Sequence, residues 1–168
     1  MIDPVATELA RETLQLARAR SLMIATAESC TGGMVAMLLT DIAGSSDVFE
    51  RGFVTYSNRA KQEMLGVPFD LLEKHGAVSR EVALAMAEGA LARSAAQLSV
   101  AITGVAGPGG GSAEKPVGLV HLAARKFDGQ VAHRECRFGA KSRHDIRSDA
   151  ARVALSMLID MLGEKAYA

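Results

Sequence analysis

The sequence predicts a three-layer α/β/α fold, with a mixed, mostly parallel sheet of about five strands and an antiparallel hairpin near the C-terminus. The first observation is that short apolar runs rich in β-branched residues alternate with helical patterns, which is typical of strands joined by helices. The second is Asp128-Gly129 between the last two strand-like runs, a strong hairpin signal. With 168 residues, of which 49% are hydrophobic, we expect one domain spanning residues 1–168.

The first half of the chain alternates helix and strand. Residues 5–20 are rich in Ala, Leu, Arg and Glu, and Asp3-Pro4 before them provides a helix start signal. Residues 22–27 form an apolar run that predicts a buried strand. Residues 31–43 are apolar on almost every side, which predicts a buried helix. Aromatic and β-branched residues over 49–57 predict a second strand.

The second half contains short helices, three strands and a final long helix. A small-residue helix suited to close packing is expected over AEGALARSAA. The last helix is predicted by apolar residues at helical spacing from Ile146 to Met161, ending at Gly163. The remaining expected segments are a helical turn over 61–65 ending at Gly66, strands over 98–103, 117–126 and 130–138, and a glycine-rich loop over 104–116.

Charge and composition limit the classes of partner that the protein is expected to bind. The formal net charge is zero, which does not favour a nucleic-acid or anionic-membrane partner. No apolar stretch approaches the roughly 20 residues of a transmembrane helix, and the N-terminus lacks a signal-peptide layout. Cys30 and Cys136 show no CxxC spacing, so neither a disulfide scaffold nor a zinc site is indicated. We therefore expect a cytoplasmic protein that binds no nucleic acid, membrane or metal.

Reactive side chains follow three predicted strands. Ser29 comes after the first, Tyr56 after the second and Thr103 after the third. Ligands of open α/β sheets bind beyond the carboxyl ends of the strands. These side chains are therefore expected to share one site.

The stretch TAESCTGG, residues 26–33, leads from the first strand into a predicted helix. Free amides at residues 30–33 could hold a phosphate or an oxyanion beside the Ser29 hydroxyl, and Gly32 and Gly33 would let a ligand approach the backbone. The alternative is that Ser29 or Thr31 serves as an N-cap, the commoner role of such residues. The stretch is not a G-x-S-x-G nucleophile elbow.

A nucleophilic serine needs a base, and Lys61 is a better candidate for it than any of the four histidines. It follows the second strand closely, and a partly desolvated lysine can accept a proton. The alternative is an ordinary solvated lysine. The four histidines form no recognisable catalytic or metal pattern and are interpreted as surface or packing residues, namely His75, His121, His133 and His144.

Three further features each allow a functional and a purely structural interpretation. Cys30 is a rival nucleophile, because a helix N-terminus lowers a thiol pKa, but we favour a buried position for it. The loop over 104–116 matches neither a Walker A loop nor a dinucleotide fingerprint, and either wraps a phosphate or ribose or is only a flexible connection. Arg143 either contacts a phosphate or is simply exposed.

Taken together, five stretches in the same order resemble the CinA C-terminal domain family over nearly the whole chain. They are AESCTGG, GFVTYSNRAK, AITGVAGPGGG, PVGLVHLA and FGAKSRHDIRSDAA. Family members include nicotinamide mononucleotide deamidases, which hydrolyse the carboxamide of that mononucleotide to nicotinate mononucleotide and ammonia in NAD salvage. The resemblance implies a three-layer α/β/α fold, a homo-oligomer, often a dimer, and catalysis without a metal or other cofactor.

The resemblance also implies roles for individual residues. Ser29 is expected to be the nucleophile, with Lys61, Tyr56 and Thr103 as further catalytic residues. The residues expected to bind a mononucleotide substrate are Cys30, Thr31, Gly32, Gly33, Gly104, Gly107 and Arg143.

Two other functions remain open from the sequence. The chain could be a nucleotide-binding or regulatory module that keeps the pocket and does no chemistry. It could also be a hydrolase of a different small amide or ester. Nothing in the sequence distinguishes a pyridine ring from another planar amide.

Overall fold

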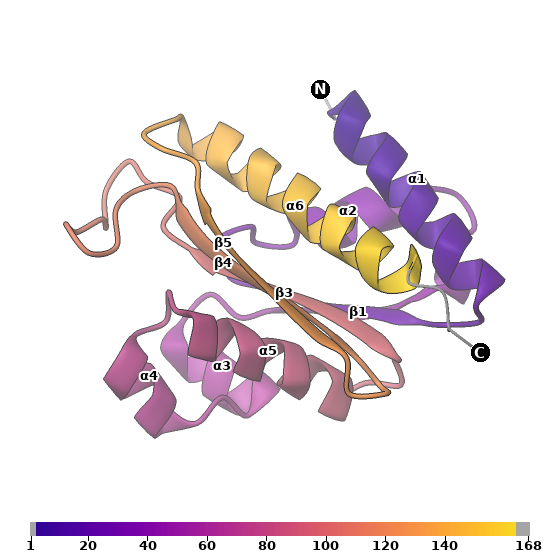
Figure 1. Cartoon of the computed structure of the whole chain (residues 1–168), viewed down its shortest axis with the longest axis horizontal. Helices are drawn as coiled ribbons and strands as arrows, with labels where there is room; N and C mark the ends of the chain where they lie inside the picture. The colour runs from indigo at the N-terminus through magenta and orange to yellow at the C-terminus, as the bar shows by residue number, and fades with distance from the viewer. Residues whose placement is uncertain (1–2, 164–168) are drawn as a thin grey trace.

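A computed structural model describes residues 3–163, which form a five-stranded mixed sheet with helices on both faces (Figure 1). The strand order is β2-β1-β3-β4-β5. The strands are β1 (Ile24–Glu28), β2 (Phe49–Val54), β3 (Leu98–Gly104), β4 (Leu119–Lys126) and β5 (Val131–Arg137). The expected mixed sheet of about five strands between two helical layers is confirmed.

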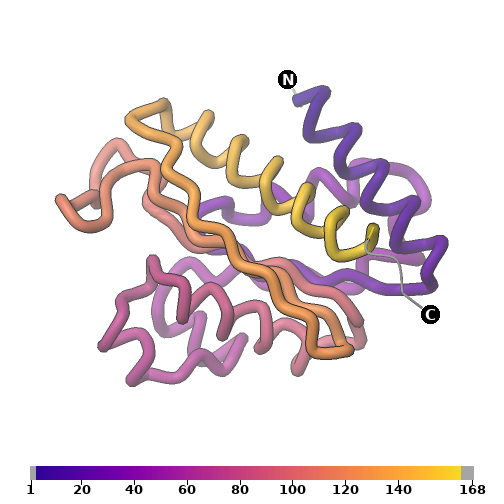
Figure 2. Tube along the Cα trace, viewed as in Figure 1, coloured from indigo at the N-terminus to yellow at the C-terminus, as the bar shows by residue number. Residues whose placement is uncertain are grey.

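The pairing brings four chain segments to one edge of the sheet. Strand β1 pairs parallel with β2 and β3, while β3–β4 and β4–β5 are antiparallel. The carboxyl ends of β1, β2, β3 and β5 therefore lie at the same edge. Figure 2 shows the glycine-rich loop and the connection that follows β5 together at one end of the molecule. Parallel and antiparallel pairs are equal in number, two of each, whereas the sequence analysis expected parallel pairs to predominate.

Six α-helices are found in the described part of the chain. One layer, above the sheet in Figure 1, contains α1 (Pro4–Ala19), α2 (Met34–Thr40) and α6 (Arg143–Gly163). The other layer contains α3 (Asn58–Leu65), α4 (Phe69–His75) and α5 (Arg80–Ala92). A 3₁₀ turn, η1 (Ser45–Asp47), precedes β2.

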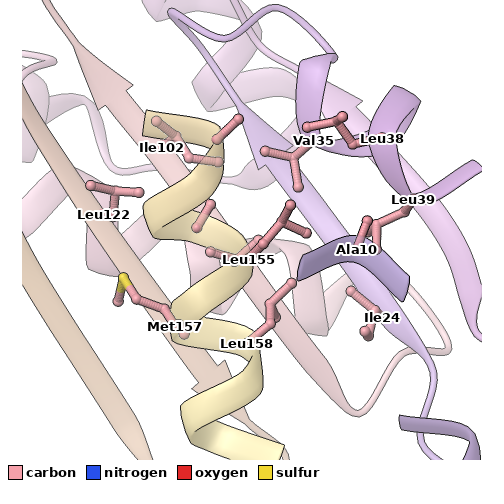
Figure 3. Close-up of a cluster of buried hydrophobic side chains, with 14 of the residues drawn as sticks. Ala10, Ile24, Val35, Leu38, Leu39, Ile102, Leu122, Leu155, Met157 and Leu158 are labelled. Atoms are coloured by element: carbon pink, nitrogen blue, oxygen red, sulfur yellow. The ribbon is translucent and has the colours of Figure 1, made fainter. Parts of the chain in front are cut away.

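Each face of the sheet has its own apolar core. On the α6 side, Ile102 and Leu122 of the sheet pack with Leu155 and Leu158 of α6, as Figure 3 shows. On the other side, Phe53, Ala101 and Ala123 pack against Val82 and Met86, among other α5 residues. Burial on both faces makes the central strands rigid supports for the groups that follow them.

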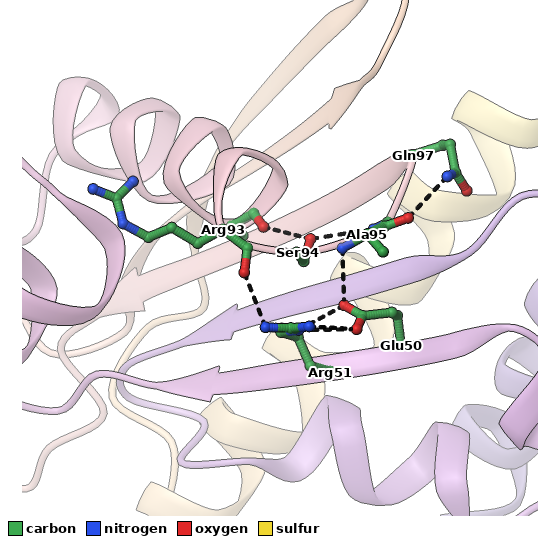
Figure 4. Close-up of polar contacts among 8 residues, drawn as sticks. Glu50, Arg51, Arg93, Ser94, Ala95 and Gln97 are labelled. Carbon is green, nitrogen blue, oxygen red and sulfur yellow. Dashed lines mark hydrogen bonds and ion pairs between the residues drawn. The ribbon is translucent and has the colours of Figure 1, made fainter.

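A polar network fixes the edge strand β2 to the loop after α5 (Figure 4). Arg51 forms an ion pair with Glu50 and donates to the carbonyl of Arg93. The backbone N–H of Ala95 donates to the Glu50 carboxylate at 3.3 Å. The network therefore satisfies backbone groups of the loop after α5 that would otherwise need water.

Several element boundaries differ from those expected. Helix α1 begins where the start signal predicts, with the Asp3 side chain accepting from Val5 N. Helix α2 begins at Met34 rather than at residue 31, because Gly32 and Gly33 both have positive φ angles, which no helix contains. Helix α4 was not predicted, and α6 begins at Arg143, three residues before its first apolar residue. In residues 3–163, no helix is long and apolar enough to cross a bilayer.

Candidate active site

A pocket of about 300 Å³ lies at the edge where β1, β2 and β3 end. Its floor and walls come from five regions of the chain: the turn after β1, the segment from β2 into α3, the loop before α5, the end of β3 with the glycine-rich loop, and the start of α6. The lining residues are Ser29, Cys30, Tyr56, Asn58, Lys61, Ala77, Val78, Thr103, Gly104, Val105, Ala106, Gly107, Gly109, Gly110 and Arg143.

Ser29 directly follows β1 and is fixed by its neighbours. Its backbone N–H donates to the Ile102 carbonyl at 2.9 Å, which extends the pairing of β1 with β3 by one residue. Its side chain lies at the pocket, and its Oγ is 2.8 Å from the Nζ of Lys61. A hydroxyl and an amine within hydrogen-bond distance are the arrangement that activates a serine nucleophile.

Lys61 is buried although it is a lysine, with 1% of the residue exposed. The hydroxyl of Ser57 caps α3 by accepting from Ala60 N, so the helix starts just after β2 and directs Lys61 inward. Its Nζ donates to the Thr55 carbonyl at 2.7 Å. Burial lowers the pKa of Lys61 from 10.5 to about 8, because an ammonium loses hydration there.

That pKa makes the neutral amine accessible near physiological pH. With one N–H donated to Thr55 O, the lone pair of the neutral amine is available to the Ser29 hydroxyl 2.8 Å away. Lys61 can therefore accept a proton from Ser29 without help from a histidine.

Cys30 lines the same pocket but is poorly suited to attack. Only 6% of it is exposed, and burial raises the pKa of its thiol to about 11. A thiol with that pKa is almost entirely protonated near pH 7, and the thiolate is the reactive form.

The turn between β1 and α2 is held from inside by Glu28. Its buried carboxylate accepts from the backbone N–H groups of Val35 and Ala36 at 2.9 and 3.0 Å. It therefore performs the capping role that the sequence analysis considered for Ser29 or Thr31, and that alternative is wrong. Gly33 occupies the N-cap position without a side-chain bond.

The same turn is held from outside by Arg147 of α6. Its Nε donates to the Cys30 carbonyl at 3.1 Å and its Nη2 to the Thr31 carbonyl at 2.9 Å. The backbone N–H of Gly32 donates to the Ser29 carbonyl. Within residues 3–163, no backbone carbonyl accepts a hydrogen bond from the N–H of Cys30, so this amide is available to a ligand.

Arg143 links two walls of the pocket. Its Nη1 donates to the Gly107 carbonyl at 2.7 Å and its Nη2 to the Tyr56 hydroxyl at 2.6 Å. Tyr56 is 60% exposed, so this pair stands at the mouth of the pocket. An arginine there can bind an anionic group with its remaining donors.

Thr103 and the two glycines after it shape the opposite wall. The hydroxyl of Thr103 donates to the Ala77 carbonyl at 2.8 Å and so fixes the loop before α5. A Cβ on Gly104 would lie 2.8 Å from Leu119 O, and one on Gly107, whose φ is +73°, would lie 2.6 Å from a Val117 methyl. These two positions accept no larger residue.

The structure brings most of the expected site residues together, but not all of them. Thr31, Gly32 and Gly33 lie in the adjacent turn and do not line the pocket. The sequence analysis did not identify Asn58, although it lies in the stretch YSNRAK that carries the family resemblance. It also missed Ala77, Val78 and Arg147, which reach the site only through tertiary packing.

The histidines lie away from the pocket lining. His121 and His133 face one another across β4 and β5, with ring nitrogens 3.0 Å apart. His75 lies 3.6 Å from Glu81. No cluster of three or more His, Cys, Asp or Glu side chains suited to a metal ion occurs within residues 3–163.

In a comparison with protein families, residues 6–162 match the CinA C-terminal domain. Nicotinamide-nucleotide amidohydrolase PncC of Escherichia coli (strain K12) is 49% identical over 159 residues, covering 94% of this chain and 95% of that protein. A CinA-like protein of Akkermansia muciniphila is 47% identical over 95% of this chain, which spans only 38% of its length.

Among solved structures, the competence/damage inducible protein CihA from Agrobacterium tumefaciens has a TM-score of 0.95 and 55% identity, covering 98% of this chain and 99% of that one. The competence damage-inducible protein A from Klebsiella pneumoniae has a TM-score of 0.90 and 34% identity, covering 95% and 98%.

Proposed function

Because this chain belongs to the CinA C-terminal domain family, we propose that it hydrolyses the carboxamide of nicotinamide mononucleotide to nicotinate mononucleotide and ammonia, a salvage step of NAD metabolism. The observation that carries the proposal is the buried contact of 2.8 Å between Ser29 Oγ and Lys61 Nζ. The name of the E. coli relative supports the substrate, because that protein matches along 95% of its length.

The first half of the reaction acylates Ser29. Its Oγ attacks the carboxamide carbon while its proton passes to Lys61, and the free N–H of Cys30 donates to the developing oxyanion. When the C–N bond breaks, Lys61 returns the proton to the departing nitrogen and ammonia leaves. Positioned proton transfer of this kind contributes ~10²–10⁴-fold.

The second half releases the acid. Water attacks the nicotinoyl ester on Ser29, and Lys61 accepts a proton from that water. The ester C–O bond then breaks, and Ser29 regains its proton. Thr103 forms part of the pocket wall and takes no part in these steps, because its hydroxyl already donates to Ala77 O.

Substrate binding is assigned to the mouth of the pocket. Arg143 and the Tyr56 hydroxyl lie at hydrogen-bond distance from each other, and together they offer donors to a phosphate. A pocket of about 300 Å³ lies at the low end of the usual range for a small ligand. The glycines at 109 and 110 leave backbone amides accessible beside it.

The test is ammonia release from nicotinamide mononucleotide, with and without a chelator, by the wild type, Ser29→Ala and Cys30→Ala. We expect release that the chelator does not affect, loss of turnover in a folded Ser29→Ala protein, and retained turnover in Cys30→Ala.

Other outcomes would replace the proposal. Turnover retained in folded Ser29→Ala would assign the nucleophile elsewhere. Binding of the mononucleotide without ammonia release would favour a binding or regulatory module. Release of ammonia only from other amides would keep the Ser29–Lys61 chemistry and change the substrate.

A further inference from the structure

Arg147 lies one helical turn after Arg143 on α6, so both side chains project from the same side of the helix. Arg143 contacts the Gly107 loop and Tyr56, whereas Arg147 contacts the turn that carries Ser29. The start of α6 therefore touches both sides of the pocket through two arginines that have different partners.

The contacts of Arg147 matter because of the geometry of Cys30. In a trans peptide the C=O and the N–H point in opposite directions. The N–H of Gly32 donates to the Ser29 carbonyl at 3.0 Å and so holds the peptide between Ser29 and Cys30. The Nε of Arg147 donates to the Cys30 carbonyl at 3.1 Å and so holds the peptide between Cys30 and Thr31. The first contact therefore sets the direction of the free N–H of Cys30, and the second holds the neighbouring peptide of the same turn.

The position of Ser29 depends on the same turn. Its own N–H is committed to Ile102 O, so this amide is unavailable as an oxyanion donor. The guanidinium of Arg147 also lies over Gly32, where an added Cβ would be 3.6 Å from its Nη2. A half-buried guanidinium gives charge-assisted bonds, which are stronger than neutral ones.

We propose that Arg147 is a positioning residue of the reaction, which holds the carbonyls of Cys30 and Thr31 so that the Ser29 hydroxyl and the Cys30 amide keep their places at the pocket. This inference rests on the proposed function for its substrate. It assigns Arg147 no contact with the substrate, in contrast to Arg143, which lines the pocket.

The experiment compares Arg147→Met and Arg147→Lys with the matched control Arg152→Met. Arg152 is the third arginine of α6, and it pairs with Asp3, the N-cap of α1, away from the pocket. Two reactions are followed in each protein. The first is ammonia release from nicotinamide mononucleotide. The second is acylation by p-nitrophenyl acetate, from which the rate measured with Ser29→Ala is subtracted. In the second reaction Ser29 Oγ bonds to the acetyl carbon, p-nitrophenolate leaves, and the serine proton passes to Lys61.

We expect Arg147→Met to lower kcat by ~10²-fold, the usual effect of a small misplacement of reacting groups. The KM should change by no more than about twofold, since substrate contacts remain. Acylation by the ester should fall by a similar factor to kcat. The midpoint of the pH profile should not move, because Arg147 does not touch Lys61. Arg147→Lys should be intermediate, because one ammonium cannot hold both carbonyls, and Arg152→Met should keep the wild-type kcat.

Three results would overturn the inference: a wild-type kcat in Arg147→Met, a loss that appears only in KM, or an equal loss of kcat in Arg152→Met. If the wild type acylates with the ester but releases no ammonia, the proposed substrate is wrong, and Arg147 is still judged on the ester reaction. If the wild type does neither, Ser29 is no nucleophile, and both proposals fall.

Discussion

Lys61 is the residue whose environment does most to determine the proposed chemistry. Burial lowers its pKa to about 8, and the amine must be neutral to accept the Ser29 proton. Below that pH the ammonium form dominates, so kcat/KM should fall about tenfold per pH unit as pH decreases. Above it the rate should reach a plateau. Steady-state rates measured between pH 6.5 and 10 check this.

A rate that stays constant from pH 6.5 to 9 would contradict the role of Lys61 as base. Cys30→Ala is the matched control, since the Cys30 thiol is a second titratable group at the pocket and is adjacent to Ser29 in the chain. Its rate should still fall with decreasing pH below the pKa of Lys61, which is about 8. Loss of that fall with this substitution would instead assign the titration to the thiol.

Sequence reasoning reached some residues of the site and not others. Ser29, Tyr56 and Thr103 were expected at one site because each follows a strand, and all three line the pocket. Arg147 could not be predicted from the sequence, because it is more than 100 residues away in the chain from its contacts Cys30 and Thr31. Glu28 carried no signal either, because a carboxylate that ends a strand is indistinguishable from an exposed one until its partners are known.

At the scale of elements, the close approach of α3 and α5 depends on one glycine. A Cβ on Gly89 of α5 would lie 2.0 Å from the Leu65 carbonyl oxygen at the end of α3. Alanine has the higher helix propensity, yet here it would force the two helices apart. We expect Gly89→Ala to lower the free energy of unfolding by ~1–3 kcal/mol, measured by urea denaturation.

Gly163→Ala is the control for that substitution. Gly163 also lies in a helix, at the end of α6, and a Cβ there meets nothing within 4 Å. This variant should be neutral or slightly more stable, because only propensity changes. If Gly89→Ala were as stable as Gly163→Ala, the contact between α3 and α5 would not exclude a Cβ at position 89.

Elements with a strong periodic or turn signal were predicted more accurately than those without one. The small-residue composition around Gly89 indicated a closely packed helix, and α5 is that helix over Arg80–Ala92. Helix α4 has only seven residues, too few for a periodic pattern to stand out. The start of α2 was misplaced because its apolar pattern did not reveal the positive φ angles of Gly32 and Gly33.

At the scale of the whole molecule, the site exists only when distant segments are folded together. The pocket is lined by residues from Ser29 to Arg143, and the sheet aligns their segments at one edge. A homo-oligomer, expected from the family resemblance, stays a prediction that light scattering of the purified protein would test.

This dispersed site leads to a prediction about stability. A ligand that binds the folded chain and not the unfolded one stabilises it by ~2.7 kcal/mol at 100 times its Kd. For a chain of this size that corresponds to a rise in Tm of roughly 5–10 °C. We expect nicotinate mononucleotide, the proposed product, to produce such a rise in the wild type and in Ser29→Ala, measured by calorimetry.

The phosphate should account for much of that rise, because Arg143 and Tyr56 offer donors at the mouth of the pocket. Nicotinate riboside, which lacks the phosphate, and the variant Arg143→Gln should each give a clearly smaller shift at the same ligand concentration. Inorganic phosphate alone serves as the control for nonspecific salt effects. If the riboside and the mononucleotide stabilised the protein equally, Arg143 would have no part in phosphate binding, and its bonds to Gly107 and Tyr56 would only brace the pocket wall.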